Sequence, residues 1–342
     1  MRITRSLVFA VALCAAATPI LAQQSWTVTR TIHVGGEGGW DYLTVDSQSH
    51  RLYVPRGTHT MVIDSDSGKT VADIPGQKRA HGVAIVPHSG RGFISDGGGD
   101  GAVVIFDLKT NAVLGVIAAQ PDADGIIFDS ASGRVLVVSG DKGILMSLDP
   151  GVDPKNGKLE KPIELGGKPE FLASDGKGKI YINLEDKNEV AVVDIKARKV
   201  TARWPVAPGG APVGMSMDTT KRRLFIGCRK PQNLIVMSAD DGSILSNLPI
   251  GQGVDATKLD GDQGFASCAD GSLAVASEKT PGKFEIVETV KTPPGARTMG
   301  IDPTTHTIYL PTAEFEESKP GTRARPKPGT FMIVVVTRRG SQ

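Results

Sequence analysis

The stretch "HRLYVPRG", residues 50–57, decides the fold, because a close copy of it, "HTIYLPTA", residues 306–313, stands near the end of the chain. Each copy follows a polar turn and contains an apolar run with a central tyrosine. The same pattern, with an aromatic or aliphatic residue in that place, recurs five more times between them. The seven copies begin at Asp46, Pro87, Asp129, Asp175, Asp218, Asp260 and Asp302. Their mean spacing, about 43 residues, is typical of propeller blades.

Four strands are expected in each repeat. The apolar run of the repeat is followed by a polar loop, a second run, a turn and a third run, and a short run before the first turn supplies the fourth strand. Gly68, Asn111 and Gly242 stand at hairpin bends that need a positive φ, whereas Arg198 fits its bend less well. Four short antiparallel strands cannot bury their faces alone and must stack on neighbouring repeats. The sequence therefore predicts an all-β fold, a seven-bladed β-propeller.

The two ends of the chain are expected to complete one blade together. The last repeat runs out at "FMIVVVTRR", residues 331–339, with only three strands, while "SWTVTRTIHVGG", residues 25–36, is a strand without a repeat. Pairing residues 25–36 as the outer strand of the last blade would close the ring and cover two exposed sheet edges. A sandwich or two smaller domains is the alternative, but no Pro/Ser-rich linker divides the repeats.

The first 22 residues have the layout of a secretory signal peptide, with Arg2 and Arg5, an apolar run, and small residues up to Ala22. Residues 23–342 would then form one propeller domain, periplasmic or secreted, and we expect a monomer. No later segment reaches the roughly 18 apolar residues of a membrane helix, so no membrane insertion is expected. Removing two arginines from 39 basic residues leaves 37, which equals the 37 acidic residues. A neutral chain lacks the broad basic field that dominates nucleic-acid affinity.

Several stretches resemble the YVTN-type repeat of exported bacterial propellers, and the YncE-like family in particular. They include "KRAHGVAIVPHSGRGFISDGGGDGAVVIFDLKT", residues 78–110, "LGGKPEFLASDGKGKIYINLEDKNEVAVVD", residues 165–194, and "GARTMGIDPTTHTIYLPTAEFE", residues 295–316. The resemblance covers nearly all of the chain after residue 22 and implies the propeller fold. It leaves the function open, because DNA binding has been proposed only within part of the family and one fold serves many activities.

Charged residues are expected to converge on one mouth of the channel. In a propeller, the loop before the innermost strand and the loop between the second and third strands lie on the same face. The first kind of loop supplies His81, Asp122, Asp124, Glu170, Asp255 and Arg297. The second kind supplies His59, Asp96, Asp141, Glu185, Asp186, Arg229 and Glu314.

From these residues we predict an exported, non-enzymatic binding or interaction protein without catalytic residues. Its partner would be a small molecule or a protein held on the charged face. The candidate ligand-binding residues are His81, Glu170, Glu185, Arg229, Asp255, Arg297 and Glu314. The alternative interpretation is that these are solvated loop charges and ion pairs that tie blades together.

A second hypothesis is a metal-dependent, lactonase-like hydrolase. No cofactor is predicted, but a divalent cation in the channel would suit the carboxylates of Glu170, Glu185, Asp255 or Glu314. The hydrolase would use Glu170, Asn183, Asp255 and Glu314, which match such enzymes by loop position only. Serine hydrolase and zinc protease chemistry have no support, because the chain has neither a Gly-x-Ser-x-Gly elbow nor two histidines at i, i+4.

A third hypothesis, single-stranded DNA binding, rests on Arg229 or Arg297 and on one insertion in the last repeat, residues 314–329. This insertion, "EFEESKPGTRARPKPG", should be extended, but its four basic residues lack an interleaved aromatic for base stacking. Cys228 and Cys268 occupy matching places in adjacent repeats. Export favours their pairing, whereas the spacing of about 10 Å expected for adjacent blades exceeds the roughly 7 Å limit for bridged Cα atoms. Both outcomes stay open.

Overall fold

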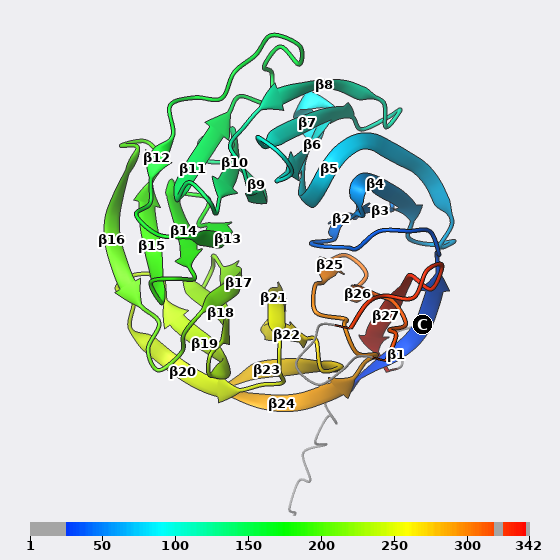
Figure 1. The fold of residues 1–342 in the computed structure, drawn as a ribbon. Helices are drawn as coiled ribbons and strands as arrows, with labels where there is room; N and C mark the ends of the chain where they lie inside the picture. The colour runs from blue at the N-terminus through cyan, green and yellow to red at the C-terminus, as the bar shows by residue number, and fades with distance from the viewer. Residues whose placement is uncertain (1–24, 318–323, 340–342) are drawn as a thin grey trace, which may run out of the picture.

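The computed structural model describes residues 25–317 and 324–339, so the predicted signal peptide, residues 1–22, lies outside the described residues. Strands account for more than half of the described residues, and the helical structure among these residues is one short 3-10 turn at Pro87–Ser89. They form five four-stranded sheets and one seven-stranded sheet, all antiparallel, arranged around a common centre (Figure 1). Among the described residues, no helix has the length and apolar character of a membrane span.

The seven-stranded sheet comes first in the chain. In order across the sheet, its strands are β2 (Thr44–Asp46), β3 (Arg51–Pro55), β4 (Gly57–Asp64), β5 (Thr70–Val86), β6 (Arg91–Asp96), β7 (Ala102–Asp107) and β8 (Val113–Ala118). The first part of β5 pairs with β4 and the second part with β6, and Ala80 pairs with both. The sequence predicts separate outer and inner strands here. They form one continuous strand because the connecting residues 75–79 stay extended.

Four further sheets follow in chain order. Their strands are β9 (Ala123–Asp129), β10 (Arg134–Ser139), β11 (Ile144–Leu148) and β12 (Ile163–Glu164); β13 (Pro169–Ser174), β14 (Lys179–Leu184), β15 (Glu189–Asp194) and β16 (Lys199–Pro205); β17 (Pro212–Asp218), β18 (Arg223–Arg229), β19 (Gln232–Ser238) and β20 (Ile244–Pro249); β21 (Val254–Asp260), β22 (Gln263–Cys268), β23 (Ser272–Thr280) and β24 (Lys283–Lys291). The first strand of each sheet lies nearest the common centre and the fourth at the rim (Figure 1).

The last sheet joins the two ends of the described chain. Its order is β1 (Trp26–His33), β27 (Met332–Arg338), β26 (Thr307–Thr312) and β25 (Gly300–Asp302). The predicted pairing is observed, with Trp26 opposite Arg338 and His33 opposite Met332. The indole N–H of Trp26 donates to the side chain of Gln263 at 2.9 Å, which also ties β1 to the preceding sheet. The edge of β27 is therefore covered.

The strand positions and hairpin bends that the repeats predict are confirmed. The two quoted stretches form β3 and β26, which are each the second strand from the centre of their sheets. Asn111 and Gly242 adopt the predicted positive φ, at 60° and 77°, and Arg198 does so too, at 53°.

The hydrophobic core lies between neighbouring sheets. One cluster combines Leu52 and Ile63 of the first sheet with Ile333 of the last. Cys228 and Cys268 belong to this kind of packing, since both are buried and neither is paired. A disulfide is thus absent between the two cysteines of the described chain, in keeping with the distance argument.

Candidate functional site

One position of the repeat contributes a side chain from every repeat to the centre of the molecule. In six of the seven repeats this position lies five residues before the first residue of the repeat, as Asp41 does before Asp46. In the second repeat it lies five residues before Val86. Because the inner strands surround a common centre, equivalent residues form a ring of positions. The residues at this position are Asp41, His81, Asp124, Glu170, Val213, Asp255 and Arg297. Six of the seven carry a side chain that can be charged.

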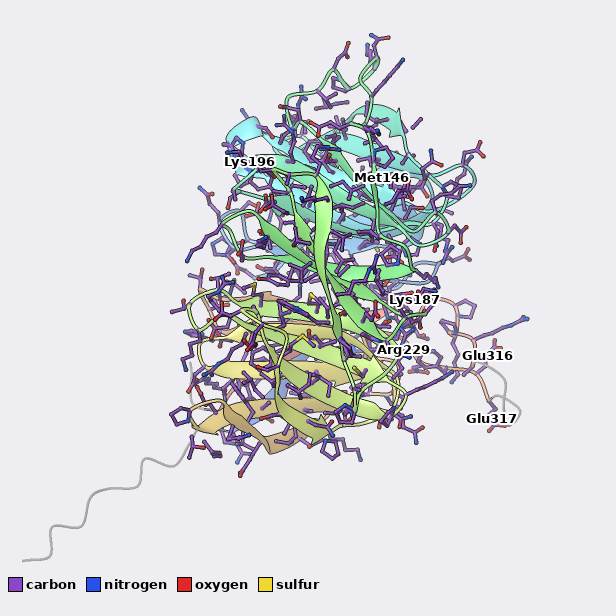
Figure 2. All side chains as sticks on the ribbon, turned by 90° about the vertical axis from the view of Figure 1, so that its left-hand side faces the viewer. Met146, Lys187, Lys196, Arg229, Glu316 and Glu317 are labelled. Atoms are coloured by element: carbon purple, nitrogen blue, oxygen red, sulfur yellow. The ribbon has the colours of Figure 1, made fainter. Side chains whose placement is uncertain are left out.

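Most of this ring lines one cavity of about 150 Å³, which we call the cup. The lining residues are Asp41, Tyr42, Arg79, His81, Asp122, Asp124, Lys168, Glu170, Arg229, Asp255 and Arg297. Figure 2 shows the molecule from the side, with Arg229 and Lys187 on the face from which Glu316 and Glu317 project, and Lys196 on the opposite face. The cup therefore opens toward the face on which the loops between second and third strands lie.

The structure brings together five of the seven candidate residues from sequence, namely His81, Glu170, Arg229, Asp255 and Arg297. Glu185 does not line the cup, but it pairs with Arg229 at 3.4 Å and with Lys168 at 3.5 Å.

Glu314 stands apart from the cup. It is exposed and pairs with Lys327 at 3.2 Å. Two further residues expected at this mouth, Asp122 and Asp124, do line the cup. The remaining four do not: His59, Asp96, Asp141 and Asp186.

Sequence reasoning missed four lining residues: Asp41, Tyr42, Arg79 and Lys168. A signal for three of them exists in the register of the repeat. Asp41 holds the ring position of the first repeat, and Arg79 and Lys168 each stand two residues before a ring residue.

Two aromatic rings from opposite sides of the centre are in contact, and one of them, Tyr42, lines the cup. Tyr42 precedes β2 and Phe171 belongs to β13, and these strands face each other across the centre in Figure 1. Their ring centroids are 4.5 Å apart. The Tyr42 side chain is only 8% exposed, and its hydroxyl donates to the backbone oxygen of Asp255 at 3.1 Å. Tyr42, which lines the cup, is therefore held in place by both its ring and its hydroxyl.

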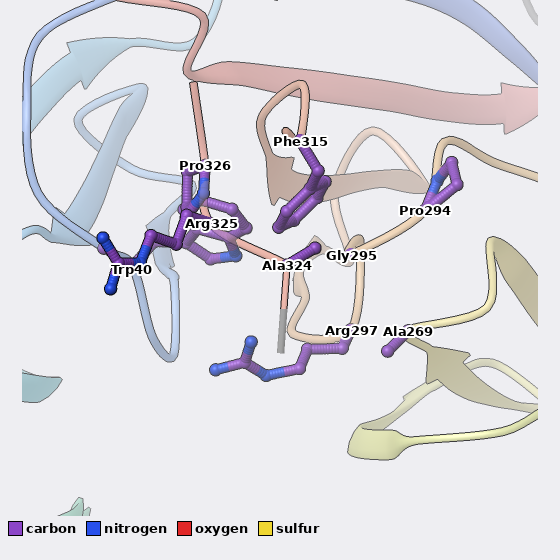
Figure 3. Close-up of a pocket in the computed structure, with 10 residues that line it drawn as sticks. Trp40, Ala269, Pro294, Gly295, Arg297, Phe315, Ala324, Arg325 and Pro326 are labelled. Atoms are coloured by element: carbon purple, nitrogen blue, oxygen red, sulfur yellow. The ribbon is translucent and has the colours of Figure 1, made fainter. Parts of the chain in front are cut away.

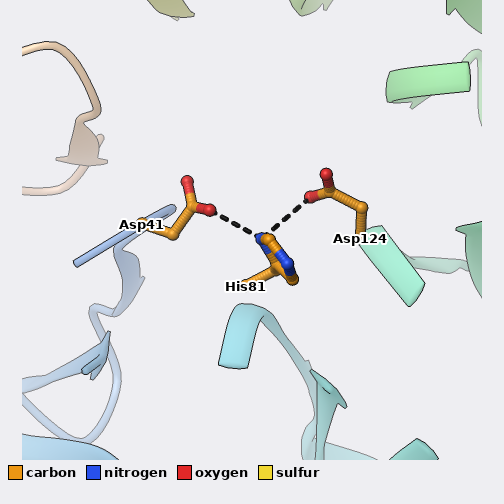
Figure 4. Close-up of side chains that lie close together, drawn as sticks. All are labelled: Asp41, His81 and Asp124. Atoms are coloured by element: carbon orange, nitrogen blue, oxygen red, sulfur yellow. Dashed lines mark hydrogen bonds and ion pairs between the residues drawn. The ribbon is translucent and has the colours of Figure 1, made fainter. Parts of the chain in front are cut away.

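His81 lies between two carboxylates on one side of the cup (Figure 4). Its Nδ1 is 2.7 Å from Oδ2 of Asp41 and 3.5 Å from Oδ1 of Asp124. Burial opposes the charged form of this 5% exposed residue, but the hydrogen bond to Asp41 and the charge of Asp124 raise the pKa of His81 to about 9. At neutral pH the imidazole is therefore protonated and forms the centre of an ionic triad.

The opposite side of the cup is built on Asp255. Both Arg229 and Arg297 pair with its carboxylate, the latter through Nε at 2.5 Å. Elsewhere in the cup, Arg79 pairs with Asp122 at 3.0 Å. Each arginine of the cup is thus paired with an acid.

Three carboxyl groups of the cup bind protons more tightly than usual. Burial raises the pKa of Asp255, although Arg229 and Arg297 work against it. Burial, together with Asp41, raises the pKa of Asp124 to about 7, although His81 works against it. Burial and the neighbouring acids Asp124 and Glu185 raise the pKa of Glu170 to about 8. Lys168, 3.3 Å from Glu170, opposes this effect only in part. The close packing of buried acids in the cup therefore makes their ionisation unfavourable.

The chemical groups that line the cup are carboxylates, one histidine, one tyrosine, one lysine and three arginines. The three atoms offered by Asp41, His81 and Asp124 lie within 4.8 Å of one another and could hold a metal ion, provided that Nδ1 of His81 loses its proton.

The metal ligands expected for a lactonase-like hydrolase do not come together. Only Glu170 and Asp255 line the cup. Asn183 is buried and donates its amide N–H groups to the backbone oxygens of Val213, at 2.8 Å, and Gly214, at 3.1 Å. Glu314 is bound to Lys327 outside the cup. The expected set is corrected accordingly: loop position alone did not indicate which side chains reach the centre.

The fold defines the class of protein. A chain of Kuenenia stuttgartiensis hydrazine synthase superposes with a TM-score of 0.69 at 12% identity, covering 81% of this chain and 93% of that one. A chain in a crystal structure of the mitotic checkpoint complex gives a TM-score of 0.72 at 14% identity, covering 90% and 95%. Radial four-stranded sheets and these likenesses make the protein a β-propeller.

Comparison of sequences identifies more specific relatives than the fold does. No family model matches the chain. "Uncharacterized protein YncE" of Escherichia coli O157:H7 is 27% identical over 163 residues, which are 43% of this chain and 45% of that protein. The protein of the same name from Salmonella typhi is 23% identical over 225 residues, 61% and 62% of the two chains. The chain is thus a distant homologue of the YncE proteins, as the repeats predict, and the match spans about half to three-fifths of their length.

Proposed function

We propose that the protein is an exported, non-enzymatic, seven-bladed propeller that binds a small positively charged ligand in the cup. The observation that carries this proposal is the charge balance of the site. Six carboxyl groups surround the cup, those of Asp41, Asp122, Asp124, Glu170, Glu185 and Asp255. Four side chains supply permanent positive charge, those of Arg79, Lys168, Arg229 and Arg297, and protonated His81 adds a fifth, so one negative charge is left over when all six acids are ionised.

The blade count follows from the double role of β5. Counting β5 once with β2–β4 and once with β6–β8 divides the seven-stranded sheet into two blades and gives seven in all. The core supports this count, because the buried hydrophobic residues of the described chain form seven clusters, each drawn mainly from two consecutive repeats. One of these clusters joins the last repeat to the first, which favours a closed ring.

A cation fits the cup because the ion pairs within the site do not neutralise all of its acids when these are ionised. Asp255 is matched by two arginines and Asp122 by Arg79. Lys168 is shared between Glu170 and Glu185. A bound cation would favour the ionised forms of Asp124 and Glu170, and so oppose the burial and the neighbouring acids that hold protons on them. A volume of about 150 Å³ restricts the ligand to a compact one, such as a small ammonium compound.

The test is a thermal-shift and calorimetry experiment on the purified chain, residues 23–342, after dialysis against chelator. Ethanolamine and putrescine should raise the melting temperature, because a ligand at 100 times its Kd stabilises by about 2.7 kcal/mol. Acetate and succinate at equal ionic strength should not. Affinity for the amines should rise between pH 6 and pH 9, since the carboxyls of Asp124 and Glu170 lose their protons in this range. Stabilisation by the acids but not by the amines would contradict the proposal.

Variants of the chain test whether the amine binds in the cup. Asp124→Asn should weaken amine binding at least tenfold, because it removes a buried charge from the cup. Asp141→Asn is the matched control, because Asp141 is an exposed acid that does not line the cup. Equal losses in both variants would place the ligand elsewhere.

A second candidate function has one specific observation in its favour. The Asp41, His81 and Asp124 triad offers a nitrogen and two carboxylate oxygens at ligating distances, which would suit a metal-dependent hydrolase. Stabilisation of the chelator-treated chain by a stoichiometric divalent metal, with lactone hydrolysis that needs the metal, would favour this function over amine binding. Single-stranded DNA binding gains no such support, since the candidate Arg229 and Arg297 share one carboxylate, Asp255, among the acids of the cup, whose like charge would repel a phosphate backbone.

A further inference from the structure

A second, larger cavity lies beside the cup and shares Arg297 with it. Its volume is about 700 Å³, within the usual range of small-molecule sites. We call this cavity the slot. Figure 3 shows Trp40, Phe315 and Arg297 around the same hollow, together with Pro294, Arg325 and Pro326. These residues come from the beginning of the described chain, from the loop before β25 and from the insertion in the last repeat.

The walls of the slot are apolar and preformed. The rings of Trp40 and Phe315 are 6.1 Å apart between centroids and inclined at 63°. Phe315 also pairs through its backbone with Pro326, and the flanking Glu316 N–H donates to the backbone oxygen of Arg325 at 2.9 Å. The described ends of the insertion are thus held together as a ladder against Trp40. A flat apolar ligand would therefore bind between side chains that are already positioned, which lowers the entropic cost of binding.

Three polar groups at the slot have hydrogen-bonding capacity to spare. Arg297 uses Nε for Asp255, and its terminal nitrogens form no hydrogen bond with the described residues. Arg325 makes no ion pair within the described ranges. The indole N–H of Trp40, a residue only 8% exposed, has no acceptor in the part of the chain that the structure describes. A buried donor without an acceptor is destabilising, so an acceptor supplied by a ligand would be favoured.

We propose that the slot binds an amphipathic carboxylate, that is, a flat apolar body carrying one carboxylate group. The body would pack on Trp40 and Phe315, and the carboxylate would accept hydrogen bonds from the guanidiniums of Arg297 and Arg325 and from the Trp40 indole. Guanidinium and carboxylate match in shape and charge, and such hydrogen bonds are the stronger kind. This site is distinct from the cup, whose occupant would be a cation, and the proposal does not depend on the cup being occupied.

The experiment compares three probes with the same ring system by calorimetry on the full chain, residues 23–342. They are 2-naphthoate, its neutral analogue 2-naphthamide, and the cationic 2-naphthylmethylamine. The naphthoate should bind at least tenfold more tightly than the amide. Equal affinity of the two, tighter binding of the amine, or no binding of any probe at millimolar concentration would overturn the proposal.

Variants separate the two parts of the recognition. Arg325→Met keeps a long side chain without the charge, and it should weaken naphthoate binding about tenfold and leave the amide unchanged. Arg339→Met, at an exposed arginine outside the slot, is the matched control and should change neither. Trp40→Phe keeps a ring but removes the N–H, and it should weaken the naphthoate more than the amide. Asp124→Asn should change naphthoate binding less than twofold, so failure of the cup and failure of the slot are distinguishable. Unchanged naphthoate affinity in both slot variants would refute this site.

Discussion

Replacing Asp41 with asparagine should lower the pKa of His81. In the unmodified chain the hydrogen bond to Asp41 and the charge of Asp124 overcome burial and raise this pKa to about 9. Asparagine can still accept a hydrogen bond but carries no charge. Loss of one opposite charge at this distance shifts a pKa by roughly 1 to 3 pH units, so His81 should titrate near or below neutrality in the Asp41→Asn variant.

The same shift predicts how stability depends on pH. A pKa of about 9 in the folded chain, against 6.5 for an ordinary histidine, corresponds to about 3 kcal/mol of folding free energy. The folded state binds the proton more tightly than the unfolded state. This stability is therefore fully present below pH 6.5 and is lost as the pH rises through about 9. In a domain of this size the loss corresponds to roughly 5 °C of melting temperature.

Two acids of the cup change stability in the same direction at lower pH. Asp124 and Glu170 have pKa values of about 7 and about 8, above the values of 3.8 and 4.5 that apply to the unfolded chain. Each binds a proton in the folded state that the unfolded chain has already released, so stability falls through these windows as well. The site-specific titration of His81 is thus needed to separate its contribution.

The assay is an NMR titration of histidine-labelled protein between pH 5.5 and 10, with the His81 signal assigned by its absence in His81→Gln. Melting curves of the unmodified and Asp41→Asn chains are recorded over the same range. Asp66→Asn is the matched control, because Asp66 lies 3.2 Å from the exposed His50 and does not line the cup. A pKa of 6.5 or below for His81 in the unmodified chain would refute the electrostatic reasoning, as would an unchanged value in Asp41→Asn.

Three further predictions concern stability and packing. Asp255→Asn should destabilise the fold by about 3 kcal/mol in urea denaturation, because two partly buried arginines lose their common counter-charge; a change below 1 kcal/mol would show that solvent already screens them. Cys228 and Cys268 should resist thiol reagents in the folded state, since burial raises the pKa of each to about 12, and both should react in urea without reductant. Gly92→Ala should destabilise by roughly 1–3 kcal/mol, because its Cβ would stand 2.1 Å from the Phe106 ring; a neutral result in the melting curve would mean that the ring moves freely.

The strands could be predicted from the sequence because the same local pattern occurs in each of the seven repeats. The polar turn and the apolar run that follows it recur in all seven repeats, so an error in one is corrected by the others. The continuity of β5 could not be predicted in this way. Whether residues 75–79 turn or stay extended depends on the pairing of β4 and β6, which are contacts between repeats rather than within one.

Arg56, the arginine of the first quoted stretch, illustrates where sequence reasoning fails. A charged residue after a strand suggests a solvated loop, yet Arg56 is only 1% exposed. Its guanidinium donates to backbone oxygens in the segment 35–39, including Gly39 at 3.0 Å, and lies 3.7 Å from the ring centroid of Phe331. Carbonyl groups leave no signature in a sequence, and Phe331 is 275 residues away. The polar partners that make this burial possible therefore became visible only in three dimensions.

The charge around the cup is likewise set by side-chain reach and not by the repeat register alone. In the fifth repeat the ring position is Val213, which is buried and carries no charge. Arg229, from the end of β18 in the same repeat, extends to the cup and pairs with Asp255 on one side and Glu185 on the other. A long side chain from the second strand thus supplies the charge that the inner strand lacks. Repeats that are equivalent in backbone can consequently build an asymmetric cup, with an acid-rich side at Asp41 and an arginine-bound side at Asp255, and such asymmetry is what orients a small ligand.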